Sequence, residues 1–235
     1  MPRPKHIDLN EIAREAMARY GFLFSFPDQV LREVDAINEG ALSRENVKDL
    51  RGLLWSSVDN SDSLDLDQLE YCERGPNQEI LVKVAIADVD LFVPKGSRTD
   101  QYASNNCTSV YTGVETFPML PDKLSHDLTS LIPGADRMAV VVEFAVLKKG
   151  NIRQGRIYRA RVSNKAKLVY EEVGAWLEGK GPAPQALKEV PGLEAQLRLQ
   201  DQAARRLKDF RLEMGALELE SLETKAVKSD EGMIV

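Results

Sequence analysis

Residues 58–69 read Val58-Asp59-Asn60-Ser61-Asp62-Ser63-Leu64-Asp65-Leu66-Asp67-Gln68-Leu69. Four carboxylates, at positions 59, 62, 65 and 67, lie within nine residues of one another. An apolar run over residues 53–58 enters this stretch, and a strand-like run over residues 69–72 leaves it. The pattern therefore predicts two strand ends joined by an acidic connection.

Carboxylates held this close together repel one another at neutral pH, which raises the pKa of some of them unless a cation neutralises the group. A hard divalent cation that prefers oxygen ligands, Mg²⁺ or Mn²⁺, is the natural partner. If the chain is extended at Asp65 and Asp67, these two side chains point to the same side. Asp59, at the end of the preceding strand, can then share the ion. We therefore take Asp59, Asp65 and Asp67 as candidate metal ligands.

A plain turn is the alternative interpretation of the same residues. Asn, Ser and Asp are favoured in turns because their side chains form hydrogen bonds with the local backbone. An Asp-Asn-Ser-Asp-Ser connection is often only the solvated end of a hairpin, and composition alone favours that explanation.

Length and charge limit the function classes. A chain of 235 residues can form one or two domains with a substantial core. The net charge of −6 counts against a protein that binds polyanions, because nucleic-acid-binding proteins usually have a basic surface. Residues 148–167, however, contain eight lysines and arginines and no acidic residue. This segment is either a local basic face for RNA or a strand pair with a solvated outer side.

The two cysteines and two histidines form no zinc pattern. Cys72 and Cys107 lie far apart in sequence, as do His6 and His126, so we expect reduced thiols in a cytoplasmic protein and no histidine-based zinc site. The first residues lack the apolar core of a secretory signal, and no run of about 18 apolar residues predicts a membrane span.

The periodicity predicts an α+β fold, with helices packed on a largely antiparallel sheet and a short helical segment before it. Helices are expected over residues 8–20, 27–34, 96–106, 167–177 and 193–214, and strands over residues 80–88, 107–111, 139–147 and 152–162. We expect residues 1–48 to be the helical segment with its linker and residues 49–235 to belong to the main domain. The first two helices either form a helix-turn-helix DNA reader or pack on the next domain, and packing is the commoner role.

Further segments add a specific resemblance. Asp59 together with Asp65-Leu66-Asp67 has the spacing of the acidic signature in the catalytic (RNB) domain of the ribonuclease II / ribonuclease R family. The segments that follow in the family's order are 84–89 (Val-Ala-Ile-Ala-Asp-Val), 93–97 (Val-Pro-Lys-Gly-Ser), 108–111 (Thr-Ser-Val-Tyr), 117–125 (Phe-Pro-Met-Leu-Pro-Asp-Lys-Leu-Ser), 128–131 (Leu-Thr-Ser-Leu) and 164–170 (Asn-Lys-Ala-Lys-Leu-Val-Tyr). The resemblance covers about residues 50–177.

The resemblance implies a metal-dependent, hydrolytic 3′-to-5′ exoribonuclease that releases nucleoside 5′-monophosphates from single-stranded RNA, with Mg²⁺ or Mn²⁺ as cofactor. It implies that Asp59 and Asp65 ligate or support the metal and that Asp67 is catalytic, binding the metal at the scissile phosphate. It also implies that Tyr111 stacks on an RNA base. Two further matching residues, Asp88 and Arg137, are interpreted as structural.

The chain departs from the family in three places. Gln68 stands where the family usually has another aspartate, and an amide oxygen can ligate a metal but brings no negative charge. The first 48 residues do not have the pattern of the small β-barrels that usually precede this domain. The arginine motif that the family uses at the phosphate is absent, so we expect a truncated N-terminal part of the domain whose activity needs a remaining C-terminal half as partner. A hairpin is expected near residues 229–235.

These departures keep two other functions open. One is an RNA-binding member of the family that has lost turnover, which Gln68 and the missing arginine suggest. The other is a phosphodiesterase or phosphatase acting on a small molecule, which the acidic net charge and the missing barrels suggest.

Overall fold

The computed structural model describes residues 8–38 and 46–218. These residues form two compact units. The first unit contains residues 8–38 and 90–124, and the second contains residues 46–89 and 125–218. Each unit is described by itself below.

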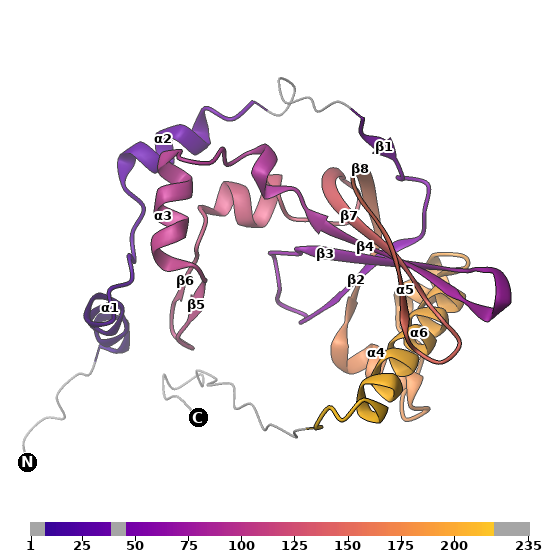
Figure 1. Cartoon of the computed structure of the whole chain (residues 1–235). Helices are drawn as coiled ribbons and strands as arrows, with labels where there is room; N and C mark the ends of the chain where they lie inside the picture. Colours follow the sequence, from indigo (N-terminus) through magenta and orange to yellow (C-terminus); the bar gives the residue numbers. More distant parts are fainter. Residues whose placement is uncertain (1–7, 39–45, 219–235) are drawn as a thin grey trace, which may run out of the picture. The chain divides into compact units, whose positions relative to one another are not determined.

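Helices dominate the first unit (Figure 1). Its elements are α1 (Leu9–Arg19), α2 (Asp28–Asp35), α3 (Arg98–Asn106), β5 (Val110–Tyr111) and β6 (Thr116–Phe117). The Asp8 carboxylate begins α1 by accepting hydrogen bonds from two backbone N–H groups of its first turn. Glu33 of α2 contacts the first turn of α3, because its carboxylate accepts hydrogen bonds from the Arg98 N–H (3.0 Å) and the Thr99 hydroxyl (2.8 Å).

The N-terminal helices use their apolar sides for packing within this unit. Ala13 and Met17 of α1 are buried against Phe117 of β6. Ile12 and Tyr20 continue the same apolar spacing along the sequence, but both side chains are exposed, so the buried face of α1 is narrower than this spacing suggests. These contacts support the packing role expected for the two helices.

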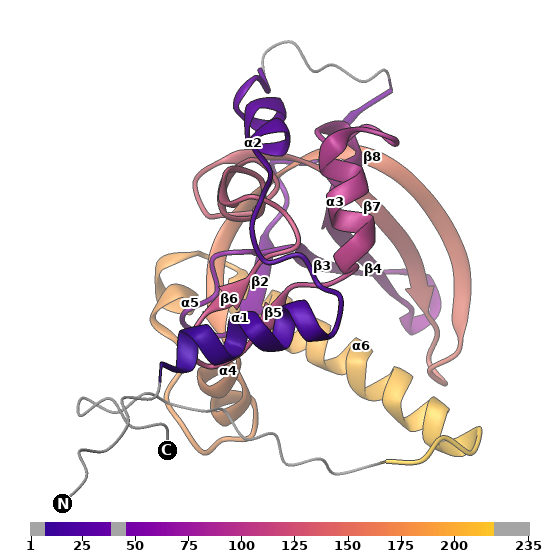
Figure 2. The ribbon, with the colours of Figure 1, turned by 90° about the vertical axis from the view of Figure 1, so that its left-hand side faces the viewer.

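A sheet that closes on itself forms the second unit. Its strands are β1 (Lys48–Asp49), β2 (Trp55–Asp59), β3 (Gln68–Arg74), β4 (Ile80–Ala87), β7 (Asp136–Val146) and β8 (Ile152–Val169). The strand order is β1-β8-β2-β3-β4-β7, and β8 pairs with β7 as well as with β2. Strands β2, β3, β4, β7 and β8 therefore form a closed, barrel-like ring. Figure 2 shows β7 and β8 as a long curved hairpin.

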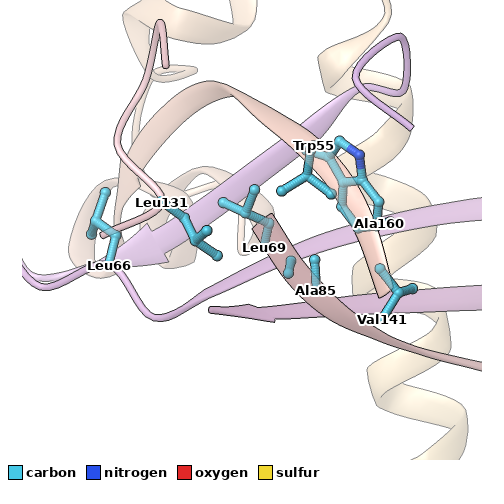
Figure 3. Packing of buried hydrophobic residues seen from close by; sticks show 9 residues of the cluster. Trp55, Leu66, Leu69, Ala85, Leu131, Val141 and Ala160 are labelled. Atoms are coloured by element: carbon cyan, nitrogen blue, oxygen red, sulfur yellow. The ribbon is translucent and has the colours of Figure 1, made fainter. Parts of the chain in front are cut away.

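Most pairings in this ring are antiparallel, as predicted, while β8 runs parallel to β1 and β2. The ring encloses one core cluster, of which Figure 3 labels seven residues. The cluster contains Trp55, Leu66, Leu69, Ala85, Leu131, Ala139, Val141, Ala160 and Val162. Alternation along each strand sends every second side chain into this core and the others to the outside of the ring.

Three helices cover part of the outside: α4 (Tyr170–Leu177), α5 (Gln185–Glu189) and α6 (Leu193–Glu213). Helix α6 packs Leu199 and Ala203 against outward side chains of β3, β4 and β7. The Gln196 side chain also accepts a hydrogen bond from the Cys72 N–H (2.9 Å) and donates one to the Cys72 carbonyl (2.7 Å). Met214, which directly follows α6 and continues its apolar spacing, is exposed.

Three short segments complete the described elements. They are 3₁₀ turns at Pro76–Gln78 and Val89–Leu91 and a π-helical turn at Lys123–Leu128. No helix in the described ranges is long and apolar enough to cross a membrane.

One helix boundary was predicted wrongly. The sequence pattern placed residues 167–177 in one helix, whereas residues 167–169 end strand β8 and α4 begins at Tyr170. Pairing explains the difference, because Lys167 and Leu168 continue the parallel ladder with β2 opposite Ser57 and Val58. The hairpin predicted near residues 229–235 lies outside the described residues.

Two glycine substitutions test the ring closure. A Cβ on Gly155 of β8 would lie 1.7 Å from the Glu143 carbonyl oxygen, beside the irregular register of β7 and β8. Because only backbone movement relieves this clash, we expect Gly155→Ala to lower the free energy of unfolding by about 1–3 kcal/mol. The matched control is Gly174→Ala in α4, where nothing lies within 4 Å of the added Cβ. This change should stabilise by about 0.5–1 kcal/mol.

Urea denaturation of the two variants measures both values. Equal free energies of unfolding for the two variants would contradict the close approach of β8 to β7.

Candidate active site

The acidic residues lie at the loop end of the β2–β3 hairpin, in and beside the connection that joins the two strands. Ser56 and Glu70 are directly opposed in this antiparallel pair. Extending that register by three residues places Asp59, the last residue of β2, opposite Asp67, which directly precedes β3. The sequence expected an extended chain at Asp65 and Asp67. Both lie in the connection outside the strand, but they are exposed on either side of the buried Leu66.

The connection is held in place by its neighbours. The Ser130 hydroxyl donates a hydrogen bond to the Leu64 carbonyl (2.7 Å) and accepts one from the Leu66 N–H (3.1 Å). The Leu131 N–H donates to the Leu66 carbonyl (2.7 Å). The Lys167 ammonium donates to the carbonyl of Ser61 (3.0 Å). These contacts, from parts of the chain far away in sequence, position the acidic side chains before any ligand arrives.

Turn chemistry is present as well. The Asp59 carboxylate accepts hydrogen bonds from the Asn60 N–H and the Ser63 hydroxyl, both at 2.7 Å. The alternative interpretation, a solvated turn held by local hydrogen bonds, is therefore correct for residues 59–63. It does not explain why Leu66 is anchored in the core three residues after Ser63, between two exposed aspartates.

The aspartates influence one another electrostatically. Burial raises the pKa of Asp67, and the charges of Asp59 and Asp65 raise it further. The pKa of the Tyr170 hydroxyl, at the start of α4, is raised by burial and then by Asp59, Glu70 and Asp67. The charges of Asp59 and Asp65 thus act on Asp67, and the charges of Asp59, Glu70 and Asp67 act on Tyr170.

Glu70 is a further carboxylate near Asp67 that the sequence analysis did not single out. It lies in β3 with its side chain on the outside of the ring. Burial, followed by the charge of Asp67, raises its pKa to about 7. The available signal was its spacing, because residues two apart in a strand share a face and Glu70 is two residues after Gln68. Nothing in the sequence indicated that this face would be covered.

The donor chemistry fits a hard divalent cation. The three aspartates offer only carboxylate oxygens, and their mutual repulsion favours a bound positive charge. Within the described ranges, however, no three acidic, histidine or cysteine side chains converge closely enough to form a complete metal site. Magnesium commonly uses one or two carboxylates and completes its shell with water and substrate phosphates. The partial donor set is consistent with that use.

The two other predicted site residues are placed differently. Gln68 is the exposed first residue of β3, opposite Ile86 of β4. Tyr111 is exposed in β5 and belongs to the first unit, whereas the aspartates belong to the second.

Arg137 and Asp88, which the sequence analysis interpreted as structural, each bind parts of the chain that are distant in sequence or hold a loop in place. The Arg137 guanidinium donates to the Ser130 carbonyl (3.1 Å) and pairs with Asp127 (2.9 Å), so it steadies the residue that holds the acidic connection. Asp88, almost fully buried at the end of β4, accepts a hydrogen bond from the Arg159 guanidinium (2.8 Å).

Much of the basic segment is engaged within the sheet. Arg153 pairs with Glu79, Arg156 with Glu143 and Arg159 with Asp88. These three arginines therefore balance acidic side chains of the neighbouring strands.

The raised pKa of Glu70 gives a prediction about stability. The unfolded chain ionises near the ordinary pKa of 4.5, whereas the folded chain resists ionisation up to about 7. Stability that Glu70 contributes at low pH is therefore lost as the pH rises between about 5 and 7, by at most about 2–3 kcal/mol. Glu70→Gln cannot ionise, so its free energy of unfolding should exceed that of the wild type increasingly over this range. Urea denaturation at several pH values measures the difference.

The matched control for this experiment is Glu213→Gln, which removes an exposed charge at the end of α6. Its stability relative to the wild type should not vary over the same pH range. A constant difference between wild type and Glu70→Gln from pH 5 to pH 7 would contradict the burial of Glu70.

Comparisons with known proteins place this fold and site in a family. Residues 47–235 match the model of the RNB domain. The chain is 33% identical over 213 residues to ribonuclease R of Thermotoga maritima, covering 89% of this chain and 29% of that protein. It is 32% identical over 234 residues to ribonuclease R of Aquifex aeolicus, covering 98% and 32%. The chain thus spans about a third of the length of these relatives.

Solved structures of similar fold include members of the same family. Mycoplasma genitalium RNase R in complex with double-stranded RNA has a TM-score of 0.82 and 26% identity, covering 94% of this chain and 39% of that one. The yeast pseudonuclease Ssd1 has a TM-score of 0.55 at 15% identity, covering 72% of this chain and 20% of that one, a likeness of fold alone. From its family match, its relatives and its α+β architecture, the chain belongs to the RNB domain family of ribonuclease R.

Proposed function

We propose that this chain forms part of a metal-dependent, hydrolytic 3′-to-5′ exoribonuclease that releases nucleoside 5′-monophosphates from single-stranded RNA. The observation that carries the proposal is the electrostatic coupling of Asp59, Asp65 and Asp67 on a connection held by Ser130 and Lys167, in a member of the RNB family. A solvated hairpin end has no need of such anchoring.

The aspartates have distinct roles in this proposal. Asp59 and Asp65 would hold or support Mg²⁺ or Mn²⁺, and Asp67 would bind the metal next to the scissile phosphate. When bound, the metal would supply an activated water and stabilise the leaving 3′ oxygen. The protein contributes the position of the carboxylates, because Leu66 is fixed in the core and the Ala87 N–H donates a hydrogen bond to the Asp67 carbonyl (2.9 Å).

The relatives support RNA as the substrate. Structures of Mycoplasma genitalium RNase R contain ribose-methylated single-stranded RNA in one case and double-stranded RNA in another. In this chain, Tyr111 would stack on a base, an interaction that tolerates every sequence. We further propose that activity requires the remaining part of the catalytic domain, since the chain spans only part of its relatives.

Two other functions remain as candidates. An RNA-binding member without turnover is favoured by Gln68, which removes one negative charge from the site, and by the likeness in fold to a pseudonuclease. A phosphodiesterase or phosphatase for small molecules is favoured only by the acidic net charge of −6.

Hydrolysis of RNA tests the proposal directly. We expect the full-length protein that contains this chain, incubated with 5′-labelled single-stranded RNA and Mg²⁺, to shorten the RNA from its 3′ end and release monophosphates. Asp67→Asn should lower the rate more than about a hundredfold and leave RNA binding intact, because it removes the charge at the phosphate and little volume. Asp62→Asn, in the same connection but without an assigned role, is the matched control and should retain activity.

The same assay separates the alternatives. Binding without products would support an RNA-binding protein, and turnover of a mononucleotide without RNA cleavage would support the small-molecule enzyme. An unchanged rate in Asp67→Asn would show that the catalytic role is assigned to the wrong residue.

Tyr111 gives an independent prediction. Tyr111→Ala should weaken the binding of single-stranded RNA by roughly 1–3 kcal/mol, because it removes the stacking face. Tyr111→Phe keeps that face and should bind as the wild type does. Fluorescence anisotropy with a labelled oligonucleotide measures both, and equal loss in the two variants would assign the effect to the hydroxyl instead of stacking.

A further inference from the structure

We propose that Glu70 is a positioning residue of the acidic site and supplies, from the next outward position of β3, the negative charge that Gln68 lacks. This inference rests on the proposed metal-dependent function. It adds to that function a residue that the acidic signature in residues 59–67 does not contain.

Strand geometry places Glu70 where this role requires it. Leu69 and Tyr71 point into the ring core and Cys72 packs outside against α6, so Gln68, Glu70 and Cys72 share the outer face of β3. Glu70 is thus the first carboxylate after Gln68 on that face. Asp67, immediately before the strand, is close enough for its charge to raise the pKa of Glu70.

Folding offers no reason for a carboxylate here. Within the described ranges, the Glu70 carboxylate has no hydrogen-bond or ion-pair partner, and its neighbours on the same face include Cys72 and Val84. The hydrogen bond from helix α6 to Glu70 goes to its backbone: the Gln200 side chain donates to the Glu70 carbonyl (3.3 Å). A half-buried, unpaired carboxylate costs stability, so its presence indicates a use outside the fold.

A second observation concerns Ser56. This residue lies directly opposite Glu70 and on the same outer face, since its neighbours Trp55 and Ser57 point into the ring. Directly opposed side chains in an antiparallel pair have Cβ atoms about 4.5–5.5 Å apart. Ser56 is completely buried, and its hydroxyl oxygen has no hydrogen-bond partner. A buried hydroxyl without a partner, on the residue directly opposite an unpaired carboxylate, is the pattern of a polar site that can accept a ligand or ordered water.

Tyr170 links this pair to the predicted ligands. The pKa of its hydroxyl is raised by the charges of Asp59, Glu70 and Asp67 together. Glu70 therefore contributes to the same negative field as the aspartates, instead of forming a separate site along β3. A positive ion near Asp67 would be attracted by Glu70 as well, and Gln68 cannot replace this attraction because its amide is neutral.

Moving the charge between the two positions tests the inference. The full-length protein that contains this chain is titrated with Mn²⁺ in the absence of RNA, and bound metal is measured by electron paramagnetic resonance. The variants are Glu70→Gln, the double variant Gln68→Asp with Glu70→Gln, and Glu213→Gln as a control for loss of a distant charge. RNA hydrolysis is measured in parallel, and thermal denaturation verifies that each variant folds.

We expect Glu70→Gln to weaken Mn²⁺ binding by about 10-fold or more, the usual effect of removing a group that supports metal ligands. The double variant should recover most of this loss, and Glu213→Gln should bind as the wild type does. Glu70→Gln should also be at least as stable as the wild type near neutral pH, whereas a purely structural glutamate would lose stability.

Three results would overturn the inference. They are unchanged Mn²⁺ affinity in Glu70→Gln, no recovery in the double variant, and an equal loss in Glu213→Gln. If the wild type itself neither binds Mn²⁺ nor cleaves RNA, the proposed function fails together with the inference. If the wild type does both and Glu70→Gln is unaffected, only the role of Glu70 is wrong.

Discussion

Besides the short β1, strand β8 pairs with two strands of the ring, β7 and β2, which lie on opposite sides of it. Over most of its length it pairs with β7, and towards its end it pairs in parallel with β2. This double pairing closes the ring, and it also brings Lys167 and Tyr170 next to the acidic connection. Without this pairing, the residues after β2 would lose their contact with Lys167, and the aspartates would lie in an ordinary hairpin loop.

The site is built at some expense to stability. Burial and mutual repulsion raise the pKa of both Asp67 and Glu70, and the Ser56 hydroxyl has no partner. Unpaired polar groups of this kind are rare in cores and collect at functional sites. The rest of the second unit compensates with a well-packed ring interior, in which Leu69, Ala85 and Val141 are completely buried. The buried core thus stabilises the fold, whereas the carboxylates at the loop end of the β2–β3 hairpin repel one another.

Local sequence patterns predicted much of this architecture. The strands near residues 80–88, 139–147 and 152–162 were found because continuous or alternating apolar runs fit buried strands. The ends of elements were less accurate. Leu168 belongs to β8 and not to a helix, because pairing with a distant strand outweighs a helical pattern of a few residues. Met214 and Ile12 appeared to be buried and are exposed, since periodicity shows which face is apolar but not how far the partner extends.

By itself, the sequence determined the candidate ligands Asp59, Asp65 and Asp67, because charge density and spacing are properties of the chain alone. It also determined the family, because several short segments occur in the same order. Only the tertiary structure decided that Glu70 is partly buried and close enough to Asp67 for their charges to interact. Its half-burial depends on α6, more than 120 residues away in sequence, whose Gln200 side chain contacts the Glu70 backbone. Burial and electrostatic coupling arise from contacts between distant segments, and no local pattern records them.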